Sequence, residues 1–461
     1  MLRVETIGCI LLHMKRFAEK YLNSWIDSKR RKVLVIRGAR QVGKSTLVRN
    51  FAADRKMDLL EINLEQYPSP SIWQSMRGKK IIKEIELATE QKVTNNTLIF
   101  IDEIQSCPTA LKALRYLHEE TPNFPVIAAG SLLEFVLVDN EISMPVGRIS
   151  YYHLGPMTFR EVLLARNKDL LEASLHEIEF ESPSVSAFNN LKEYYKEYLF
   201  TGGMPEAVQA SIEEDSILAS REIHRSIIST YKDDFGKYKN KISPEIINLV
   251  FNHIPLHLGQ KVKYVNISRN VASRQLKEAI DALIKARIVL PAYHTSCLGI
   301  PLKSTIDTKI QKLYFLDVGL AAYMAGIDWN DFRHDDISII NKGNISEQFV
   351  AQHLAYRYDG LEAPELFYWL REGKSTNAEV DFIVSNKGKV VMIEVKSGKS
   401  GSLRSVHQLI AKTRQKNAYR FDMNPSSTQT VHTSIQTKDG QKEIEFDLLS
   451  HPVYMVETFL Q

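Results

Sequence analysis

The stretch "LVIRGARQVGKSTLV", residues 34–48, joins a short apolar run to a glycine-rich loop and then to a helix-like segment. The run Val33–Ile36 is typical of a strand that is covered on both faces of a parallel sheet. The loop that follows has the form G-x4-G-K-S and extends from Gly38 to Ser45. This order of strand, loop and helix predicts an α/β fold with a phosphate-binding loop.

The spacing of the loop residues has a chemical reason. Glycines let backbone N–H groups turn inward around the β-phosphate of a nucleotide, and the Lys44 side chain reaches the β and γ oxygens. The Ser45 hydroxyl is placed to bind Mg²⁺ at the positive end of the following helix. We therefore expect ATP and Mg²⁺ as cofactors, with the nucleotide bound by Gly38, Ala39, Arg40, Gln41, Val42, Gly43, Lys44, Ser45 and Thr46.

A second apolar run, "TLIFIDE", ends in Asp102 and Glu103. Two acids at the end of a buried strand complete an ATP site, where Asp102 would hold the water shell of Mg²⁺ and Glu103 would polarise the attacking water. The next run, "FPVIAAGS", ends in Ser131, which is either a sensor of the γ-phosphate or an ordinary turn residue. Arg148 is a finger for a neighbouring subunit of a homo-oligomer, an intramolecular γ-phosphate contact, or an exposed arginine.

Several segments together resemble a family of bacterial and archaeal AAA-plus-type ATPases. In that family an N-terminal ATPase domain is joined to a C-terminal domain of unknown function related to restriction-endonuclease-like folds. The segments are "RGARQVGKSTL" (37–47), "TLIFIDEIQ" (97–105), "VIAAGS" (126–131), "VGRI" with "HLGPMTFREVL" (146–149 and 153–163) and "FTGGMPEAV" (200–208). The resemblance covers about residues 15–420, and its ATPase motifs are more specific than the downstream ones. We expect an ATPase domain at 15–165, a helical lid and winged helix-turn-helix region at 190–325, and a PD-(D/E)XK nuclease-like α/β domain at 335–461.

The middle region predicts helices followed by extended segments. In the helix-like segment 272–289, apolar residues recur at helical spacing and leave Arg274, Lys277 and Lys285 off the apolar stripe. This pattern looks like a winged helix-turn-helix whose second helix docks in a DNA groove. Such modules also serve as lids or protein-docking domains in AAA-plus proteins, so both roles remain open.

The formal net charge of +4 is concentrated in two windows. Residues 261–312 hold ten Lys or Arg and three Asp or Glu, and residues 396–420 hold seven Lys or Arg and no acid. Basic windows in an otherwise acidic chain favour a nucleic acid partner, with DNA as the first expectation; a solvated basic face without a partner is the alternative.

Acidic residues and a lysine recur in the C-terminal part. Glu347 borders the apolar face of a helix-like segment, and the strands "AEVDFIVSN" and "KVVMIEVKSG" carry Asp381 and Glu394. Alternation puts Glu394 and Lys396 on one face of the second strand. The D-x12-E-x-K spacing is similar to the PD-(D/E)XK nuclease core, although no proline precedes Asp381. The resemblance implies that Glu347, Asp381 and Glu394 bind Mg²⁺ and that Lys396 activates water or stabilises the charged phosphate. A DNA-binding shell without cleavage is the alternative.

Composition limits the class of protein. The longest early apolar run, "IGCILL", is far shorter than the ~20 residues that cross a bilayer, and three separated cysteines indicate neither a disulfide framework nor a zinc cluster. We expect a cytoplasmic location without membrane contact, and Met14 as a second plausible start that makes residues 1–13 dispensable. The expected function is an Mg²⁺-dependent ATPase acting on nucleic acid, with DNA cleavage as an added activity. The alternatives are a nucleotide-dependent switch acting on protein partners and a scaffold that binds ATP without turnover.

Overall fold

The computed structural model describes residues 14–66, 70–134, 147–176, 184–237, 242–297, 299–333, 342–357, 360–371, 377–396, 403–413, 415–437 and 440–459. The chain forms two compact units. The first consists of residues up to Pro156 with the segments 285–287 and 358–363, and the second consists of the remainder. Residues 1–13, which we expected to be dispensable, lie outside the described residues.

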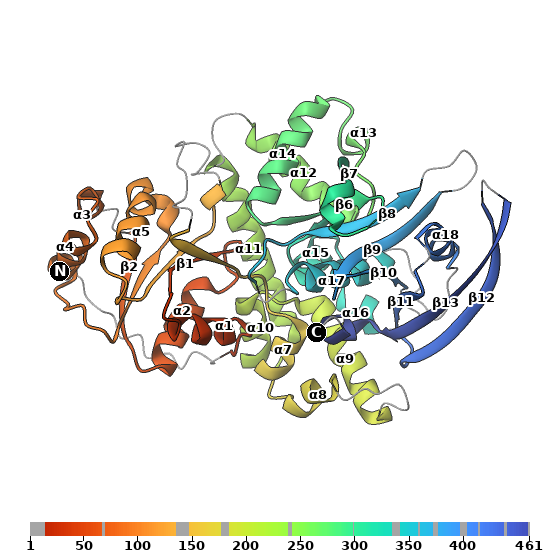
Figure 1. Ribbon diagram of the computed structural model, residues 1–461, viewed down its shortest axis with the longest axis horizontal. Coiled ribbons are helices and arrows are strands. Elements are labelled where there is room, and N and C mark those ends of the chain that lie inside the picture. Colours follow the sequence, from red (N-terminus) through yellow and green to blue (C-terminus); the bar gives the residue numbers. More distant parts are fainter. Residues whose placement is uncertain are drawn as a thin grey trace. The chain divides into compact units, whose positions relative to one another are not determined.

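The first unit contains a five-stranded parallel sheet with helices around it (Figure 1). Its elements are α1 (Ala18–Ile26), β1 (Val33–Arg37), α2 (Lys44–Asp54), β2 (Asp58–Asn63), α3 (Pro70–Trp73), α4 (Gly78–Thr89), β3 (Thr97–Asp102), η1 (Ile104–Ser106), α5 (Pro108–Glu120), β4 (Val126–Gly130) and β5 (Ile149–His153). The strand order is β2-β3-β4-β1-β5, and every neighbouring pair is parallel. The predicted parallel α/β sheet is therefore confirmed.

Burial on both faces explains why β1 has a continuous apolar sequence. Its residues Val33 and Val35 join a core cluster that includes Ile81 of α4 and Leu114 of α5. Leu34, whose side chain alternates to the other face, is also fully buried. The phosphate loop follows the C-terminal end of this buried strand and leads into α2 at Lys44.

The second unit combines a group of helices with an eight-stranded mixed sheet. Its first elements are α7 (Phe159–Ala165), α8 (Asp169–Ser174), α9 (Val185–Thr201), α10 (Pro205–Glu213), η2 (Ile217–Ala219), α11 (Ser220–Asp234), η3 (Phe235–Lys237), α12 (Pro244–His253), η4 (Ile254–Leu256), α13 (Tyr264–Ile267) and α14 (Ser273–Lys285). They are followed by β6 (Val289–Thr295), η5 (Leu302–Thr305), β7 (Ile306–Phe315), α15 (Val318–Met324), α16 (Trp329–Arg333), α17 (Lys342–Ala355), β8 (Leu366–Arg371), β9 (Ala378–Asn386) and β10 (Lys389–Val395). The last are α18 (Arg404–Thr413), β11 (Asn417–Asp422), β12 (Ser427–Thr437), β13 (Gly440–Pro452), η6 (Val453–Met455) and α19 (Val456–Phe459).

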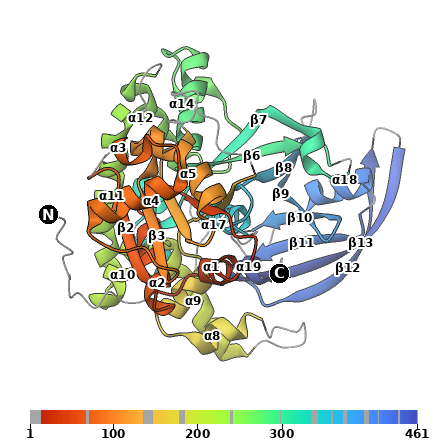
Figure 2. The same cartoon turned by 60° about the vertical axis from the view of Figure 1, so that its left-hand side comes forward.

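The strands of this sheet run in the order β12-β13-β11-β10-β9-β8-β6-β7. Figure 2 shows the sheet extending from β7 at one edge to β12 at the other. Strands β9 and β10 form a hairpin, and the turn between them has positive φ at both Lys387 and Gly388, which suits a two-residue turn.

The two regions that we expected at 190–325 and 335–461 share this sheet. Strand β6 of the hairpin β6–β7 pairs in parallel with β8, and both regions belong to one compact unit. That compact unit begins at Met157, and its Phe159 contacts the rings of Tyr198 on α9 and Phe349 on α17. Residues Tyr264–Ile267 form a short helix between α12 and α14.

Two buried glutamines of α17 close the end of the edge strand β7. Gln348 accepts a hydrogen bond from Phe315 N at 2.7 Å and donates one to Phe315 O at 2.7 Å. Gln352 accepts one from Val318 N at 2.9 Å. A side-chain amide thus satisfies backbone groups that no further strand pairs with. These bonds fix α17 against β7 and so fix the position of Glu347.

The glycine pair after α9 ends that helix and allows a close backbone contact. Gly202 ends the helix with a φ of 71°. Gly203 lies so close to Met157 that an added Cβ would be 1.9 Å from Met157 O. Met157 N also donates a hydrogen bond to Gly203 O at 2.6 Å. A residue larger than glycine therefore cannot occupy position 203 without moving backbone.

Among the described residues, no helix has the length and apolar character needed to cross a membrane.

We predict that Gly203→Ala destabilises the chain by about 1–3 kcal/mol, because its methyl group must displace the backbone at Met157. Urea unfolding measures the loss. Gly236→Ala is the matched control, since a Cβ there meets no atom within 4 Å. Equal stability of the two variants would contradict the close contact.

Candidate functional sites

The phosphate-loop lysine is buried at the start of α2. Lys44 Nζ donates hydrogen bonds to Ala39 O at 2.7 Å and to Gly38 O at 3.2 Å. Burial lowers the pKa of Lys44 to about 8, although the nearby Glu103 and Asp102 favour the charged form. Gly43 precedes the helix with a φ of 86°, a conformation that glycine adopts readily. The loop thus presents a desolvated ammonium group at a helix N-terminus.

The two halves of the expected ATP site meet in the structure. Ser45 Oγ donates a hydrogen bond to Asp102 Oδ2 at 2.6 Å, and Glu103 N donates to Asp102 Oδ1 at 2.9 Å. Burial is the largest cause that raises the pKa of Asp102. A hydroxyl and a carboxylate are oxygen ligands of the kind that Mg²⁺ binds, so these residues fit the ion.

Glu103 is held in an uncommon conformation. Its φ of 49° is in the left-handed region, and its carboxylate accepts a hydrogen bond from Gln105 Nε2. Gln105 also lies against Gly130, where a Cβ would be 2.5 Å from Gln105 Oε1. Sequence reasoning missed Gln105, although it lies in the quoted segment "TLIFIDEIQ".

Ser131 follows β4, the strand between β3 and β1. Its side chain is buried, and its hydroxyl has no hydrogen-bond partner among the described residues. Buried hydroxyls are usually paired, so this orphan hydroxyl is compatible with the predicted sensor of the γ-phosphate.

Arg16 is a second residue of this region that sequence reasoning missed. It is buried before α1 and donates hydrogen bonds to Val42 O at 3.1 Å and to Gly155 O at 2.8 Å. It therefore ties the loop backbone to the segment after β5. No pattern in the sequence marks it, because its acceptors are backbone carbonyls distant along the chain.

The remaining predicted nucleotide residues surround Lys44. Ala39 and Val42 are buried, Gln41 has a φ of 64°, and Thr46 is half-buried in the first turn of α2. The guanidinium group of Arg40 forms an ion pair with Glu65, with 3.7 Å between Arg40 Nη2 and Glu65 Oε1.

Arg148 pairs with Glu119 of α5 at 2.9 Å, and its side chain is 44% exposed. Its described ion pair is therefore with a helix of its own unit. The role as a finger for a neighbouring subunit stays a prediction.

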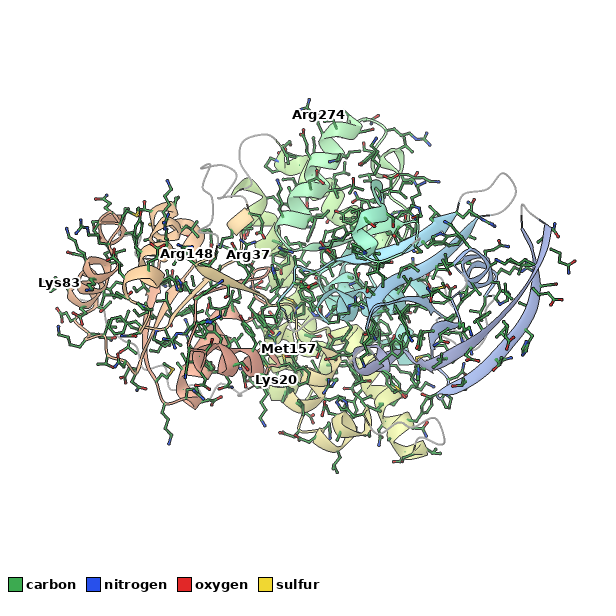
Figure 3. The ribbon with its side chains drawn as sticks, in the orientation of Figure 1. Lys20, Arg37, Lys83, Arg148, Met157 and Arg274 are labelled. Atoms are coloured by element: carbon green, nitrogen blue, oxygen red, sulfur yellow. The ribbon has the colours of Figure 1, made fainter. Side chains whose placement is uncertain are left out.

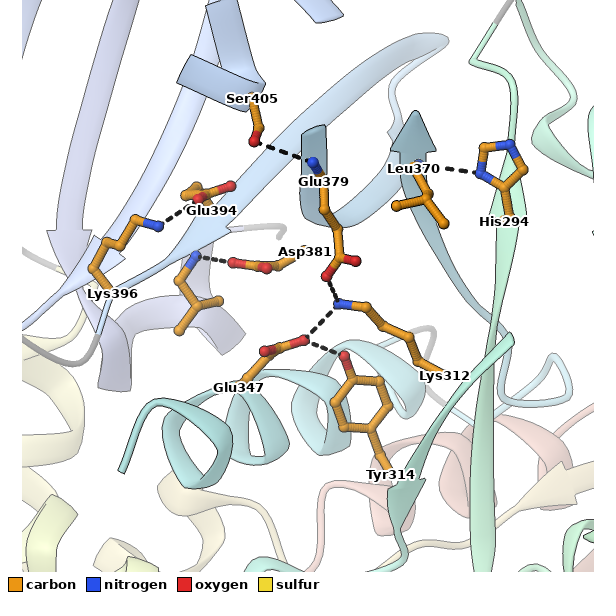
Figure 4. Close-up of polar contacts among 11 residues, drawn as sticks. His294, Lys312, Tyr314, Glu347, Leu370, Glu379, Asp381, Glu394, Lys396 and Ser405 are labelled. Atoms are coloured by element: carbon orange, nitrogen blue, oxygen red, sulfur yellow. Dashed lines mark hydrogen bonds and ion pairs between the residues drawn. The ribbon is translucent and has the colours of Figure 1, made fainter. Parts of the chain in front are cut away.

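The acids of the C-terminal part gather beside β7, β9 and β10 (Figure 4). Lys396 Nζ is 2.5 Å from Glu394 Oε1, and Asp381 Oδ2 accepts a hydrogen bond from Val395 N at 2.8 Å. The carboxylate of Glu347 on α17 accepts hydrogen bonds from Lys312 and Tyr314. The structure therefore brings Asp381, Glu394 and Lys396 together, and it adds partners that were not expected.

Crowded carboxylates change each other's ionisation. Burial, and after it the charge of Asp381, raises the pKa of Glu394 to about 8. These two effects outweigh the nearby Lys396, which lowers the pKa. Burial also raises the pKa of Glu347 to about 7, against the opposing effect of Lys312. Glu394 Oε2 is buried without a hydrogen-bond partner among the described residues.

Three residues of this cluster were missed by sequence reasoning. Lys312 and Tyr314 lie on β7, and Glu379 lies on β9, where it forms an ion pair with Lys312. Strand alternation was the available signal. Lys312 and Tyr314 are two residues apart, as are Glu379 and Asp381, so each pair is expected on one face of its strand. The pairing of Lys312 with Glu379 could not be inferred from the sequence, because β7 and β9 are separated by more than 60 residues.

The predicted Mg²⁺ ligands of the cluster do not fit the ion as they are arranged. Glu347 faces Lys312, Glu394 faces Lys396, and Asp381 binds a backbone N–H group. In the part of the chain that the structure describes, no group of three or more His, Cys, Asp or Glu could hold a metal ion.

The basic windows contain many internally paired residues. Lys312 is buried, Lys303 pairs with Glu365, and Arg420 pairs with Asp422. The residues of α14 differ, because the described ion pairs of Arg274 and Lys277 are with residues of the same helix, and the two side chains are 88% and 59% exposed. Figure 3 shows Arg274 projecting outward from its helix. Lys285 is also exposed.

Comparison with known proteins assigns the first unit. The family model of an AAA domain matches residues 30–163. Residues 192–331 and 342–444 match models described as domains of unknown function, DUF8612 and DUF4143. No curated protein matches the chain.

Solved structures that resemble the chain include the RuvB Holliday junction branch migration motor of Thermotoga maritima and a substituted form of that motor. Each is 16% identical, with 59% of this chain and 87% of the other covered, and the TM-scores are 0.27 and 0.28. A TM-score this low does not establish a common arrangement of the chains. The AAA match and the parallel sheet make residues 30–163 an AAA-type P-loop ATPase domain.

We predict that Glu394→Gln reduces the pH dependence of stability between pH 5 and 8. In this window the folded wild type keeps a proton on Glu394 that the unfolded chain has lost, so its stability falls as pH rises. Glutamine does not titrate, and the slope changes by up to about 1.4 kcal/mol per pH unit. Urea unfolding at a series of pH values measures it. The exposed Glu365→Gln is the control, and parallel slopes for wild type and Glu394→Gln would refute the raised pKa.

Proposed function

We propose that this protein is an Mg²⁺-dependent ATPase that acts on a nucleic acid, DNA in the first place, which docks on α14. The observation that carries the ATPase part is the hydrogen bond between Ser45 and Asp102, because it joins the phosphate loop to the acidic end of β3. The AAA family match supports hydrolysis and not binding alone.

Each residue of the site then has a distinct role. Bound MgATP supplies the phosphoryl group that is transferred to water. Lys44 binds the β and γ oxygens, and Ser45 with Asp102 supplies oxygen ligands or orients the ion's water. Glu103, restrained by Gln105, orients the attacking water, and the unpaired Ser131 hydroxyl contacts the γ-phosphate. Arg148 completes the site of a second copy in a homo-oligomer.

The nucleic acid part rests on α14 and its surroundings. Helices α12, α13 and α14 are followed by the antiparallel hairpin β6–β7, the order of elements in a winged helix. Leu276, Ile280 and Leu283 bury one face of α14. Exposed pairs such as Arg274–Glu278 contribute little stability, so these cations can turn to phosphate at small cost.

The rival function is a nucleotide-dependent switch that acts on protein partners. Internal pairing within the basic windows favours it, because fewer cations are then available to phosphate than the sequence count suggests. The two functions differ in their response to DNA and to salt.

We predict that plasmid DNA raises the rate of ATP hydrolysis by the wild type, and that the double variant Arg274→Gln, Lys277→Gln loses this stimulation while basal hydrolysis remains. The slope of log affinity against log salt should fall by about 1 for each lost phosphate contact. A coupled assay of ADP release and a salt titration of DNA binding measure these effects.

We also predict that Glu103→Gln retains bound ATP and that its turnover is about 100-fold or more lower than that of the wild type, because the attacking water is no longer polarised.

The double variant Lys79→Gln, Lys83→Gln is the matched control, because it removes two exposed cations of α4. Hydrolysis that ignores DNA in every protein would exclude the nucleic acid function and favour the protein-partner switch. ATP binding without turnover in the wild type, unchanged in Glu103→Gln, would favour a scaffold that binds ATP without hydrolysis.

Cleavage of DNA is the second candidate function, and the proximity of Asp381, Glu394 and Lys396 is the observation that favours it (Figure 4). Lys396 would stabilise the negative charge that develops on the phosphate.

We predict that any nicking of supercoiled plasmid by the wild type is lost in both Asp381→Asn and Lys396→Met. A gel assay of plasmid topology reads the result, and the exposed Lys389→Met on the same strand is the control. Nicking that persists in Asp381→Asn would assign it to a contaminant, and a plasmid that stays intact with the wild type would leave the cluster without cleavage activity under these conditions.

A further inference from the structure

A lysine side chain, Lys312, supplies a positive charge inside the carboxylate cluster. Lys312 has no exposed surface, and its ammonium group contacts Glu347 Oε1 at 3.1 Å and also Glu379 Oε1. These two acids come from α17 and β9, so the ammonium joins two elements. An ammonium without water is costly unless carboxylates of this kind surround it.

The oxygen that a metal ion would need is already occupied. Glu347 Oε1 accepts hydrogen bonds from both Lys312 and Tyr314, and a carboxylate oxygen has two lone pairs. The backbone of Gly259 also packs against this carboxylate, because a Cβ at Gly259 would lie 2.8 Å from Glu347 Oε1 and 2.9 Å from Oε2. This leaves little room for the water shell that a hard cation keeps.

All of these restraints come from the middle region of the sequence. Lys312 and Tyr314 lie on β7, and Gly259 N donates a hydrogen bond to Leu313 O at 3.2 Å, between them. The family models that match residues 192–331 and 342–444 are separate. The cluster is therefore composite, with its four acids from one region and its buried cation Lys312 from the other.

We propose that the Lys312 ammonium is a built-in cation that occupies the carboxylate cluster in place of a divalent metal ion, so that metal binds there only when Lys312 is removed or displaced. The acids Glu347, Glu379, Asp381 and Glu394 outnumber the two lysines of the cluster, Lys312 and Lys396. Loss of one lysine charge therefore increases the attraction for a divalent ion. This inference stands whether or not the ATPase acts on nucleic acid.

Binding of Mn²⁺ to the full chain without nucleotide tests the proposal, with isothermal titration calorimetry as the readout. Methionine has an unbranched side chain of similar length to lysine and no charge, so Lys312→Met keeps the packing and removes the cation. We expect Lys312→Met to bind one more Mn²⁺ than the wild type, or to bind it at least about tenfold more tightly. Adding Asp381→Asn should abolish the gain.

Lys303→Met is the matched control, because it removes a lysine paired with Glu365 at an exposed position. It should bind Mn²⁺ as the wild type does. Equal Mn²⁺ binding by wild type, Lys303→Met and Lys312→Met would overturn the proposal, and so would a wild type that binds as tightly as Lys312→Met.

Unpaired acids can also prevent Lys312→Met from folding. Recovery of its circular dichroism spectrum on adding Mn²⁺ would then support the proposal. If it stays unfolded, the double variant Lys312→Met, Glu379→Gln restores the charge balance of the cluster without an ammonium group. This variant should bind Mn²⁺ more tightly than the wild type, and failure to do so would overturn the proposal.

Discussion

The parallel pairing of β6 with β8 is the contact on which the second unit depends. It joins residues 292–294 to residues 366–368 and so makes one sheet from two distant regions of the chain. Because β7 pairs with β6, the same contact places Lys312 and Tyr314 beside α17. The glutamines of α17 then close the edge of β7, and the carboxylate cluster becomes a consequence of strand order.

The two sites differ in how far the sequence predicts them. The phosphate loop lies between adjacent elements, so its strand, glycines, lysine and serine can be recognised within fifteen residues. The end of β3 was also predictable, because two acids after a buried strand complete an ATP site when a phosphate loop precedes them. The residues that hold the site in place were not predictable. Arg16 bonds backbone carbonyls that are distant along the chain, and the contact of Gln105 with Glu103 depends on side-chain packing.

The carboxylate cluster was predicted only in part. Its D-x12-E-x-K portion lies on one hairpin, and alternation along the second strand of that hairpin puts Glu394 beside Lys396. Lys312 was counted in the sequence as part of a basic window suited to a polyanion, whereas the structure buries it as a counter-ion. Charge counted along a sequence cannot separate exposed cations from buried ones, because that distinction is made by tertiary pairing. Arg274, in contrast, keeps the exposure that the count assumes.

The shared sheet also limits how this protein can change over generations. A recombination event that replaced residues 192–331 alone would bring in a new β7 beneath unchanged acids of α17 and β9. Without a lysine at the matching position, the largely buried Glu347 would lose its ammonium partner, at a cost of about 3–5 kcal/mol. The two regions, although they match separate domain families, are therefore constrained to be inherited and to diverge as one module.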